Sequence, residues 1–444
     1  MARTTGYKKV AALFAAVSVA SMGLVACSSG GEAPAPESDG GAEAPAEAIT
    51  IQYLHRLPDG EGMVPVSDIV ARWNAENPEI QVEAVKFDGA SAEMIKKLET
   101  DVKANNAPCL AQIGYGEVPE MFSKGLVEDV AAEAEKYKAN YSGAYGQMQV
   151  GDAVVGLPQD TGPLVYFYDE AAFNELGIEV PTTVDELKAA AKTAAEQGKY
   201  ILDFEPDETA YQLSALAAAA GDTWYSAEND AWKVTTAGDG AKVVADFWQE
   251  MIDSGAALTH ERWGDAYANA LASGELVGNI GPAWEAGFML DGVVPEGEEG
   301  TWKVALLPVF GSEPMTGPDG GSGVAVMKGC EYPAEAMKFN DWFNTQTEDL
   351  ATQGLVVAAL GEVSTPEKVK TQFGGQDVFA ELAKANETLN PNFGYIPGFS
   401  AVGAKMNEVA GNVVAGNGKI MDIFTAAQEE SINTLKSLNL PVAE

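Results

Sequence analysis

Short apolar runs alternate with stretches of helical periodicity from residue 49 onward. Between the first two runs, apolar residues recur every three or four positions over 66–77, and Asn77-Pro78 ends that predicted helix. A second helical pattern follows at about 94–102. The three apolar runs that we predict to be strands are 49–54, 80–86 and 109–113. This strand–helix order predicts an α/β fold with a parallel sheet.

Polar side chains follow the ends of these predicted strands. The carboxyl ends of parallel strands meet at one edge of a sheet, where ligands of open α/β sheets tend to bind. We therefore expect a common rim made of His55, Arg56, Asp88, Tyr115 and Glu117.

Farther along, the run 156–162 (GLPQDTG) precedes a strand predicted at 164–168. A helix start follows, because Thr183 and Glu186 have the spacing of a capping box and a helical pattern runs to about residue 197. The α/β pattern thus continues beyond the first sheet. About 395 residues follow the start of the first predicted strand. This number is larger than one hydrophobic core usually holds, so we predict two domains.

The chain is strongly acidic, with 66 Asp and Glu against 27 Lys and Arg. Phosphates are bound by clustered Lys and Arg, and the sequence contains no such cluster. Nucleic acid is therefore not an expected partner. After Ala26 no apolar stretch has membrane-spanning length.

The N-terminal segment has the features of a secretory leader. Three basic residues precede an apolar run at 10–20, and the sequence Leu24-Val25-Ala26-Cys27 looks like a bacterial lipobox. We expect residues 1–26 to be a signal peptide and Cys27 to carry lipid on the outer face of a cell membrane. Residues 27–48 contain only small, polar and acidic residues after Cys27, which predicts a flexible linker.

Two further cysteines, Cys109 and Cys330, lie in the body of the chain. Outside the cell they could form a disulfide, or both could be buried free thiols, because sequence spacing does not determine their geometry.

Several motifs occur together in the order typical of one family. They are the lipobox, the strand–helix opening, 156–158 ahead of 166–169, the helix start at 181–187, 281–284 (GPAW), 307–311 (LPVFG) and 320–323 (GGSG). The chain resembles the extracellular solute-binding proteins of sugar-importing ABC transporters, of the maltose- and oligosaccharide-binding type, over essentially its whole body. One departure is Pro108-Cys109-Leu110, where such proteins usually have Pro-Asp-Val.

The resemblance implies a two-lobed clamshell that closes on its ligand. We place lobe one at 49–161 with 306–346 and lobe two at 162–305 with 347–444. Cys109 and Cys330 would then share a lobe, which favours a disulfide. The resemblance also implies a monomer that captures an oligosaccharide and delivers it to membrane permease subunits, with no cofactor, no metal and no catalysis.

A carbohydrate site needs hydrogen-bonding groups for the hydroxyls and flat rings for the C–H faces of the sugar. The candidate rings, each of which could instead belong to the core, are Tyr115, Trp224, Trp263, Trp284 and Phe399. The candidate polar groups, each of which could instead be a surface or capping group, are His55, Arg56, Asp88, Glu117, Asp160, Glu285, Gly321 and Ser322. We expect three other tryptophans to be core, namely Trp73, Trp248 and Trp342.

Alternative functions remain open from the sequence alone. A glycan-active enzyme would need a pair of carboxylates, which 66 acidic residues supply by abundance. Only His55 and His260 are available for serine-hydrolase or zinc chemistry, and they form no ligand-spaced pair. A binder of a polyamine, a peptide or a metal complex is the stronger alternative, although Arg56 at the expected rim argues against a polyamine.

Overall fold

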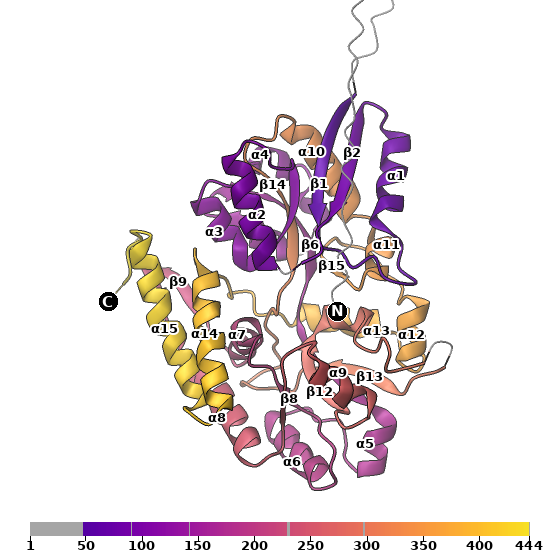
Figure 1. Ribbon diagram of the computed structural model, residues 1–444, viewed down its shortest axis with the longest axis vertical. Coiled ribbons are helices and arrows are strands. Elements are labelled where there is room, and N and C mark those ends of the chain that lie inside the picture. The colour runs from indigo at the N-terminus through magenta and orange to yellow at the C-terminus, as the bar shows by residue number, and fades with distance from the viewer. Residues whose placement is uncertain (1–47, 90, 142, 229–230, 296–297, 444) are drawn as a thin grey trace, which may run out of the picture. The chain divides into compact units, whose positions relative to one another are not determined.

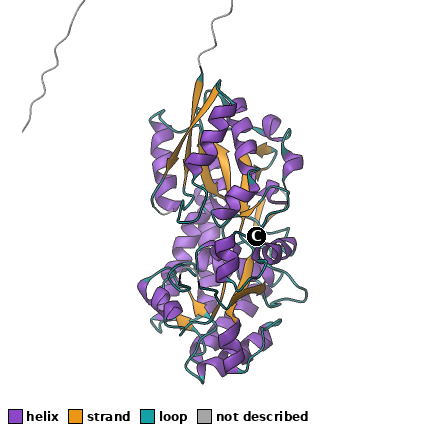
Figure 2. Cartoon of the chain, turned by 90° about the vertical axis from the view of Figure 1, so that its right-hand side faces the viewer, coloured by secondary structure: helices purple, strands orange, loops and turns teal. Residues whose placement is uncertain are grey.

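The computed structural model describes residues 48–89, 91–141, 143–228, 231–295 and 298–443. The predicted signal peptide, Cys27 and the predicted linker up to residue 47 lie outside the described residues. The described body is a mixed α/β fold of the two-lobed type, and each lobe has a sheet flanked by helices (Figures 1 and 2). The residue boundaries of the two lobes stay a prediction.

The larger sheet has six strands and contains the predicted opening of the chain. Its first two strands pair in parallel over their full length, from Ile49 opposite Ile80 to His55 opposite Lys86. The strand order is β15 (Val356–Val357), β6 (Gly156–Thr161), β14 (Ser322–Val326), β3 (Leu110–Gly114), β1 (Ile49–His55) and β2 (Ile80–Lys86). The predicted strand–helix–strand–helix–strand order is confirmed.

Helices cover this sheet because each presents one apolar stripe to it. In α1, Ile69, Val70 and Trp73 are buried, as their spacing predicts. The helices associated with this sheet are α1 (Val66–Glu76), α2 (Ser91–Lys103), α3 (Val118–Ser123), α4 (Ala131–Ala134), α10 (Pro333–Asn344) and α11 (Thr347–Thr352). A short hairpin, β4 (Gln149–Val150) with β5 (Ala153–Val154), lies beside α3 and α4.

The smaller sheet is antiparallel, with β7 in its centre. Its strands are, in order, β12 (Gly278–Pro282), β7 (Leu164–Asp169) and β13 (Trp302–Leu306). Val165 and Phe167 of β7 belong to a separate hydrophobic core that α9 and α13 complete. The helices near this sheet are α5 (Glu170–Leu176), α9 (Asp265–Ala272), α12 (Glu367–Gln372) and α13 (Val378–Glu387).

A helical layer continues from the smaller sheet. Its helix α7 packs on α8 and α14, and ten of its eleven residues are buried. Most of them are apolar, as a helix that is buried on nearly every side requires, although Thr209, Gln212 and Ser214 are buried as well. The helices of this layer are α6 (Val184–Ala195), α7 (Thr209–Ala219), α8 (Asp239–Asp253), α14 (Phe399–Val414) and α15 (Ile420–Ser437). Two short strand pairs accompany them, β8 (Asp203–Phe204) with β11 (Leu258–Thr259), and β9 (Tyr225–Glu228) with β10 (Ala231–Val234). The predicted capping box of Thr183 and Glu186 starts α6.

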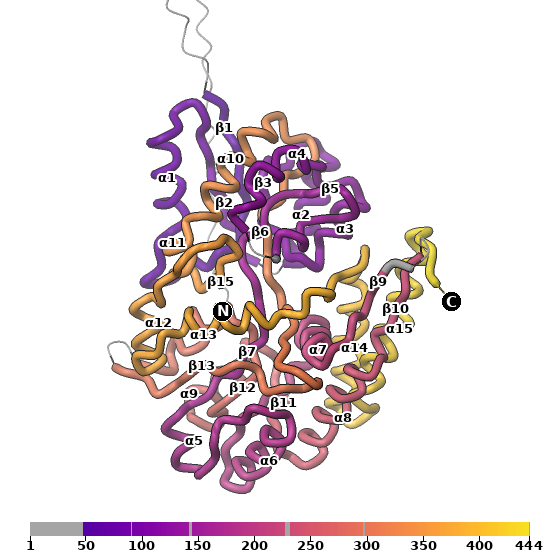
Figure 3. The backbone as a smooth tube through the Cα atoms, turned by 180° about the vertical axis from the view of Figure 1, so that it is seen from behind, coloured from indigo at the N-terminus to yellow at the C-terminus, as the bar shows by residue number. Residues whose placement is uncertain are grey.

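Two chain segments cross side by side between the two sheets (Figure 3). One leads from β6 into β7, and the other leads into β14. The amide of Leu164 donates to the carbonyl of Gly317 at 3.1 Å, and the amide of Asp319 donates to the carbonyl of Gly162 at 2.7 Å. Residues 162–164 and 317–319 are therefore held in register, and they lie next to the candidate site.

The structure joins Cys109 and Cys330 in a disulfide, with their Cα atoms 4.6 Å apart. Of the two alternatives that the sequence left open, the free-thiol alternative is therefore excluded. The bond also explains the unusual Pro108-Cys109-Leu110, because position 109 pairs with Cys330 just after β14.

Candidate functional site

A cavity of about 570 Å³ opens beyond the carboxyl ends of β1 and β3. We call it the aromatic cavity. On the opposite side, its wall comes from the loops that precede α7 and α9 and from the 3₁₀ helix Ala283–Gly287. Its volume is in the range of small-molecule sites. The lining of the cavity includes Arg56, Glu117, Asp160, Glu208, Trp263, Trp284, Phe288 and Asp319.

A chain of hydrogen bonds builds the wall next to the larger sheet. The amide of Arg56 donates to the side chain of Gln112 at 2.8 Å, and Gln112 Nε2 donates to the hydroxyl of Ser322 at 3.1 Å. The amide and hydroxyl of Ser322 both donate to Asp160. Tyr115 completes the chain, because its hydroxyl donates to the carbonyl of Asp160 at 2.7 Å. The polar groups of this wall are thus held in place before any ligand arrives.

Two carboxyl groups of this wall are shielded from water. Burial raises the pKa of Asp160 to about 6, although the donors of Ser322 and the charge of Arg56 counteract it. Burial also raises the pKa of Glu117, against the charge of Arg56 and a hydrogen bond from Ser91. Both groups accept hydrogen bonds when ionised, which suits hydroxyl donors.

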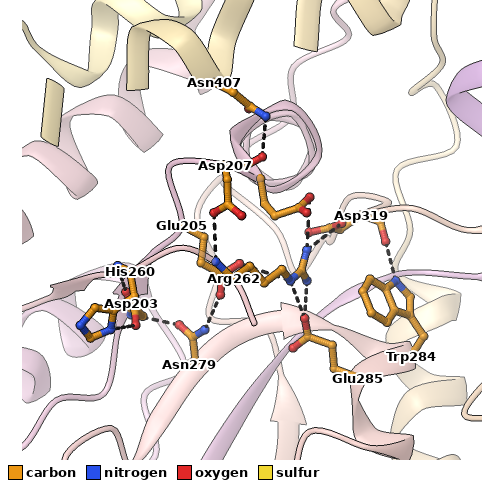
Figure 4. Close-up of polar contacts among 11 residues, drawn as sticks. Asp203, Glu205, Asp207, His260, Arg262, Asn279, Trp284, Glu285, Asp319 and Asn407 are labelled. Atoms are coloured by element: carbon orange, nitrogen blue, oxygen red, sulfur yellow. Dashed lines mark hydrogen bonds and ion pairs between the residues drawn. The ribbon is translucent and has the colours of Figure 1, made fainter. Parts of the chain in front are cut away.

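The opposite wall contains a buried ion cluster around one arginine (Figure 4). The side chain of Arg262 is 3% exposed, and its Nε donates to Glu285 Oε1 at 2.8 Å. Three other carboxylates surround the guanidinium at 3.4–3.9 Å, those of Glu205, Glu208 and Asp319. We call these five residues the Arg262 cluster.

The Arg262 cluster holds more acidic groups than its single cation can neutralise. Burial raises the pKa of Asp319 to about 6 and the pKa of Glu208 to about 7, and the charge of Arg262 opposes both shifts. The pKa of Glu205 lies well above its ordinary value, chiefly through burial. The four surrounding carboxylates in turn keep Arg262 charged despite its burial.

Three aromatic rings line the cavity beside this cluster. Trp284 and Phe288 stack with ring centres 5.9 Å apart, and Trp263 lies 5.3 Å from Phe288. The guanidinium carbon of Arg262 sits 5.0 Å from the centre of the Trp284 ring. The indole of Trp284 is oriented further by a hydrogen bond from Nε1 to the carbonyl of Asp319, at 3.0 Å. The cavity thus offers apolar ring area next to charged acceptors.

Trp263 has an unusual backbone. Its φ is +60°, a left-handed conformation that costs a residue with a Cβ of the order of 1 kcal/mol or more. Its neighbours fix the loop, because the amide of Arg262 donates to Asp207 at 3.0 Å and that of Gly264 to the carbonyl of Glu261 at 3.0 Å. Trp263 is 43% exposed although its side chain is large and apolar. Trp263 is thus a strained and exposed aromatic residue in the wall of the aromatic cavity.

The structure brings most of the predicted residues together. Those that line the aromatic cavity are Arg56, Tyr115, Glu117, Asp160, Trp263, Trp284, Gly321 and Ser322. Gly321 has a φ of +87°, and a Cβ there would approach Tyr115 to 2.7 Å, so only glycine fits this wall. Whether these residues contact a ligand stays a prediction.

Two predicted polar residues of the strand-end rim lie outside the cavity. The side chain of His55 turns into the core beside Tyr53, with ring centres 5.5 Å apart, and burial lowers its pKa to about 4. Asp88 is exposed and faces Lys86 at 3.5 Å. Successive residues at a strand end point to opposite faces, so Arg56 reaches the cavity and His55 does not.

Two predicted rings also lie outside it. Trp224 is fully buried and packs against Tyr225 and Phe424, and its ring centre lies about 6 Å from the ring centre of each. Phe399 starts α14, is 1% exposed and packs on Tyr395. Their placement corrects the prediction of a cavity position, because residues near loops can still point into a core. Glu285 lies behind the cavity wall, where it holds Arg262.

Several residues of the site were not predicted from the sequence. They are Gln112, Glu208, Tyr211, Arg262, Phe288 and Asp319. Arg262 and Asp319 adjoin residues that were singled out, Trp263 and Gly320-Gly321, and this proximity was the one available signal. Their convergence depends on segments that are far apart in the chain.

A hollow of about 870 Å³ is larger than the aromatic cavity, and it lies between residues 356–365 and helices α12 and α13. Among the described residues its only aromatic lining is Phe379, and no buried ion cluster adjoins it. The chemistry therefore favours the aromatic cavity as the ligand site.

No group of three or more His, Cys, Asp or Glu among the described residues is arranged to hold a metal ion. No helix in the described part combines the length and apolarity needed to cross a bilayer.

The chain matches a family profile and several solved structures. Residues 60–348 match the profile of the family described as bacterial extracellular solute-binding protein. The galacto-N-biose-/lacto-N-biose I-binding protein of an ABC transporter from Bifidobacterium longum, solved with lacto-N-biose, is 51% identical to this chain with a TM-score of 0.87. The match covers 90% of this chain and all of that one. Comparison with curated proteins gives no match.

Less similar structures share the fold. One is an ABC transporter associated binding protein from B. animalis subsp. lactis in complex with β-1,6-galactobiose, at 21% identity, with a TM-score of 0.76 over 90% of this chain and 100% of that one. Another is the sugar-binding protein MalE from Xanthomonas citri, at 18% identity, with a TM-score of 0.70 over 88% of this chain and 98% of that one. At these identities the likeness concerns the fold alone, and it confirms the two-lobed α/β architecture.

Proposed function

The chain belongs to the family of bacterial extracellular solute-binding proteins, and on that premise we propose that it captures a carbohydrate of disaccharide size outside the cell for an ABC importer. The similar protein from Bifidobacterium longum holds lacto-N-biose, which makes this disaccharide the first candidate ligand. The single observation in this chain that carries the proposal is the aromatic cavity, where rings and oriented polar groups face the same space.

Each wall of the cavity has a distinct role in this proposal. Trp263, Trp284 and Phe288 supply flat area for the C–H faces of a sugar ring, at little cost in conformational entropy. Asp160 and Glu117 accept hydrogen bonds from hydroxyls, and Arg56 donates to ring or hydroxyl oxygens. A ligand that satisfies both kinds of surface is amphipathic and rich in hydroxyls.

The charges around the cavity support a neutral ligand. Four carboxylates line it, those of Glu117, Asp160, Glu208 and Asp319, against two guanidiniums. An acidic sugar would be repelled by this excess. A polyamine would have to sit beside Arg56 and Arg262, both of which are positively charged, so the polyamine alternative loses support.

Capture in this proposal involves no chemistry on the ligand. The sugar contacts the walls from both lobes and stabilises the closed arrangement by the contacts that only this arrangement offers. The expectation that the chain is not an enzyme rests on its family, whose members are binding proteins. The closed protein then docks on the permease subunits.

We also retain the lipid anchor as part of the proposal. The family description places its members outside the cytoplasm. Lipid on Cys27 and the linker up to residue 48 would hold the binding body close to a membrane-bound permease. Mass spectrometry of the membrane fraction tests this point, because a Cys27→Ala variant should lose both the lipid mass and the membrane association.

Intrinsic tryptophan fluorescence of the purified protein tests the function. We expect a saturable change with lacto-N-biose or a related neutral disaccharide, and its loss in Trp284→Ala. Trp232→Phe, in β10 and outside the cavity, serves as the matched control and should bind normally. A response to spermidine or to short peptides, with none to any sugar, would overturn the carbohydrate assignment.

A further inference from the structure

Asp319 places a buried carboxylate oxygen in the wall of the aromatic cavity without a hydrogen bond. The residue lines the cavity and is 2% exposed. Its Oδ2 atom accepts no hydrogen bond from any residue that the structure describes. A buried carboxylate oxygen normally has a donor, so Oδ2 has an unused capacity to accept a hydrogen bond.

The backbone of Asp319 is fixed on both sides. Its amide donates to the carbonyl of Gly162 at 2.7 Å, and its carbonyl accepts from Trp284 Nε1 at 3.0 Å. A Cβ at position 162 would come within 2.2 Å of the Asp319 carbonyl oxygen, so the two crossing segments approach this closely only with Gly162. The backbone that carries the carboxylate is therefore positioned before binding.

The other carboxylate oxygen of Asp319 faces the Arg262 cluster. Oδ1 lies 3.9 Å from Arg262 Nη1, which is beyond a hydrogen bond but close enough for attraction (Figure 4). Burial raises the pKa of Asp319 to about 6, with Arg262 opposing the rise and Glu285 adding to it. At neutral pH the group is therefore mostly ionised and accepts hydrogen bonds only.

We propose that Asp319 Oδ2 is a specificity-determining acceptor that takes a hydrogen bond from a hydroxyl or amide N–H of the bound sugar. This inference rests on the proposed function and names a residue for it. A sugar that lacks this one donor would leave the buried charge without a partner, and such sites reject the deficient analogue strongly.

Glu205 has a similar unpartnered oxygen, Oε2, but does not line the cavity. Its other oxygen accepts from Asn279 Nδ2 at 3.1 Å, and Oε2 lies 3.4 Å from Arg262 Nε. Glu205 therefore serves the charge balance of the Arg262 cluster. Glu208 and Asp319 both line the cavity and face Arg262, and of these two residues Asp319 is the one with a buried carboxylate oxygen that accepts no hydrogen bond from the described residues.

Titration calorimetry of the full chain with lacto-N-biose tests the proposal. The variants are Asp319→Asn, which keeps the shape of the side chain, and Asp319→Ala. We expect each to weaken binding by about tenfold or more, because a charged acceptor is lost. Asp185→Asn, exposed on α6, is the matched control and should bind like the unmodified protein.

A set of analogues identifies the donor. Each analogue of lacto-N-biose lacks one hydroxyl, and one further analogue has a hydroxyl in place of the acetamido group. We expect one analogue to bind weakly to the unmodified protein but to lose nothing further in Asp319→Asn, since both changes remove the same hydrogen bond. The identity of that analogue distinguishes a hydroxyl from an amide donor.

Two results would overturn the inference. If Asp319→Asn and Asp319→Ala bind lacto-N-biose as tightly as the unmodified protein, Asp319 is not an acceptor, and the proposed function still stands. The inference also fails if the losses for every analogue simply add to the loss in Asp319→Asn. Absence of binding of all sugars to the unmodified protein would instead overturn the proposed function, and the inference with it.

Discussion

The guanidinium of Arg262 lies over the ring of Trp284, with 5.0 Å between its carbon and the ring centre. The same arginine donates to Glu285, whose 3₁₀ helix also carries Trp284. One buried cation thus contacts both a carboxylate of the Arg262 cluster and an aromatic ring of the cavity. A cation over a desolvated tryptophan contributes about 1–2 kcal/mol.

Loss of this cation should therefore damage both stability and binding. Arg262→Ala leaves several buried carboxylates without a counter-charge, and we expect the free energy of unfolding to fall by about 3–5 kcal/mol. We expect Arg262→Lys to recover only part of this, because an ammonium cannot reproduce the planar geometry of the guanidinium. Urea unfolding of both variants measures the effect, and equal stability of Arg262→Ala and the unmodified protein would contradict it.

The disulfide makes a separate prediction. Cys109 and Cys330 are 221 residues apart in the chain, so the bond restricts the unfolded state over a long loop. We expect the Cys109→Ala/Cys330→Ala double variant to lose about 2–4 kcal/mol of unfolding free energy. Urea unfolding with and without a reductant measures it. Reductant should destabilise the unmodified protein and leave the double variant unchanged; the same response in both would show that this bond does not contribute.

A direct contact joins α3, beside the larger sheet, to the first turn of α14 in the helical layer. Ser400 Oγ donates to Glu120 Oε2 at 2.7 Å, and Lys124 pairs with the other oxygen of Glu120 at 2.8 Å. If this contact stabilises the closed arrangement, Ser400→Ala should weaken sugar affinity by about two- to tenfold, chiefly through faster dissociation.

Stopped-flow fluorescence measures that dissociation rate. Ser123→Ala is the matched control, since its hydroxyl donates to the backbone of Glu120 within α3 itself. Equal dissociation rates for Ser400→Ala and the unmodified protein would exclude a role for the contact in closure.

The buried carboxylates predict how stability depends on pH. The folded pKa is about 6 for Asp160 and Asp319 and about 7 for Glu208, in each case above the ordinary value. Their stabilising contribution is complete below about pH 4 and is lost as the pH rises through about 6–7. His55 acts in the opposite direction, because its lowered pKa of about 4 stabilises the protein above its ordinary pKa of 6.5 and this contribution is lost on acidification.

Between about pH 7.5 and 5.5, the three carboxylates change the free energy of unfolding more than the one histidine does. After allowance for solvent screening at the partly exposed Glu208, we expect about 1 kcal/mol more unfolding free energy at the lower pH. Thermal unfolding across this range measures it, and Asp319→Asn should show a flatter profile. A melting temperature that falls steadily from pH 7.5 to 5.5 would contradict this account.

The sequence pattern predicted the local elements well. The first helix was expected at 66–77 and runs from Val66 to Glu76, and the second strand has the predicted bounds. The core positions of Trp73 and Trp248 are confirmed, because their apolar neighbours recur at helical spacing. Periodicity reports which face of an element is buried, and these residues lie within regular elements.

The candidate site was only partly predictable, for a physical reason. Trp224 and Trp263 both lie in loops, yet one is fully buried and the other is 43% exposed. Nothing local separates them, since the burial of Trp224 depends on Phe424 in a distant helix. Arg262 and Asp319 likewise meet only because the loops before α9 and before β14 converge in the fold.

A crystal structure of the protein grown with lacto-N-biose tests the central claim most directly. The account predicts sugar density in the aromatic cavity, with a ring against Trp263 or Trp284 and a donor within hydrogen-bonding distance of Asp319 Oδ2. Sugar bound instead in the hollow between residues 356–365 and helices α12 and α13, with the aromatic cavity free of ligand, would contradict it.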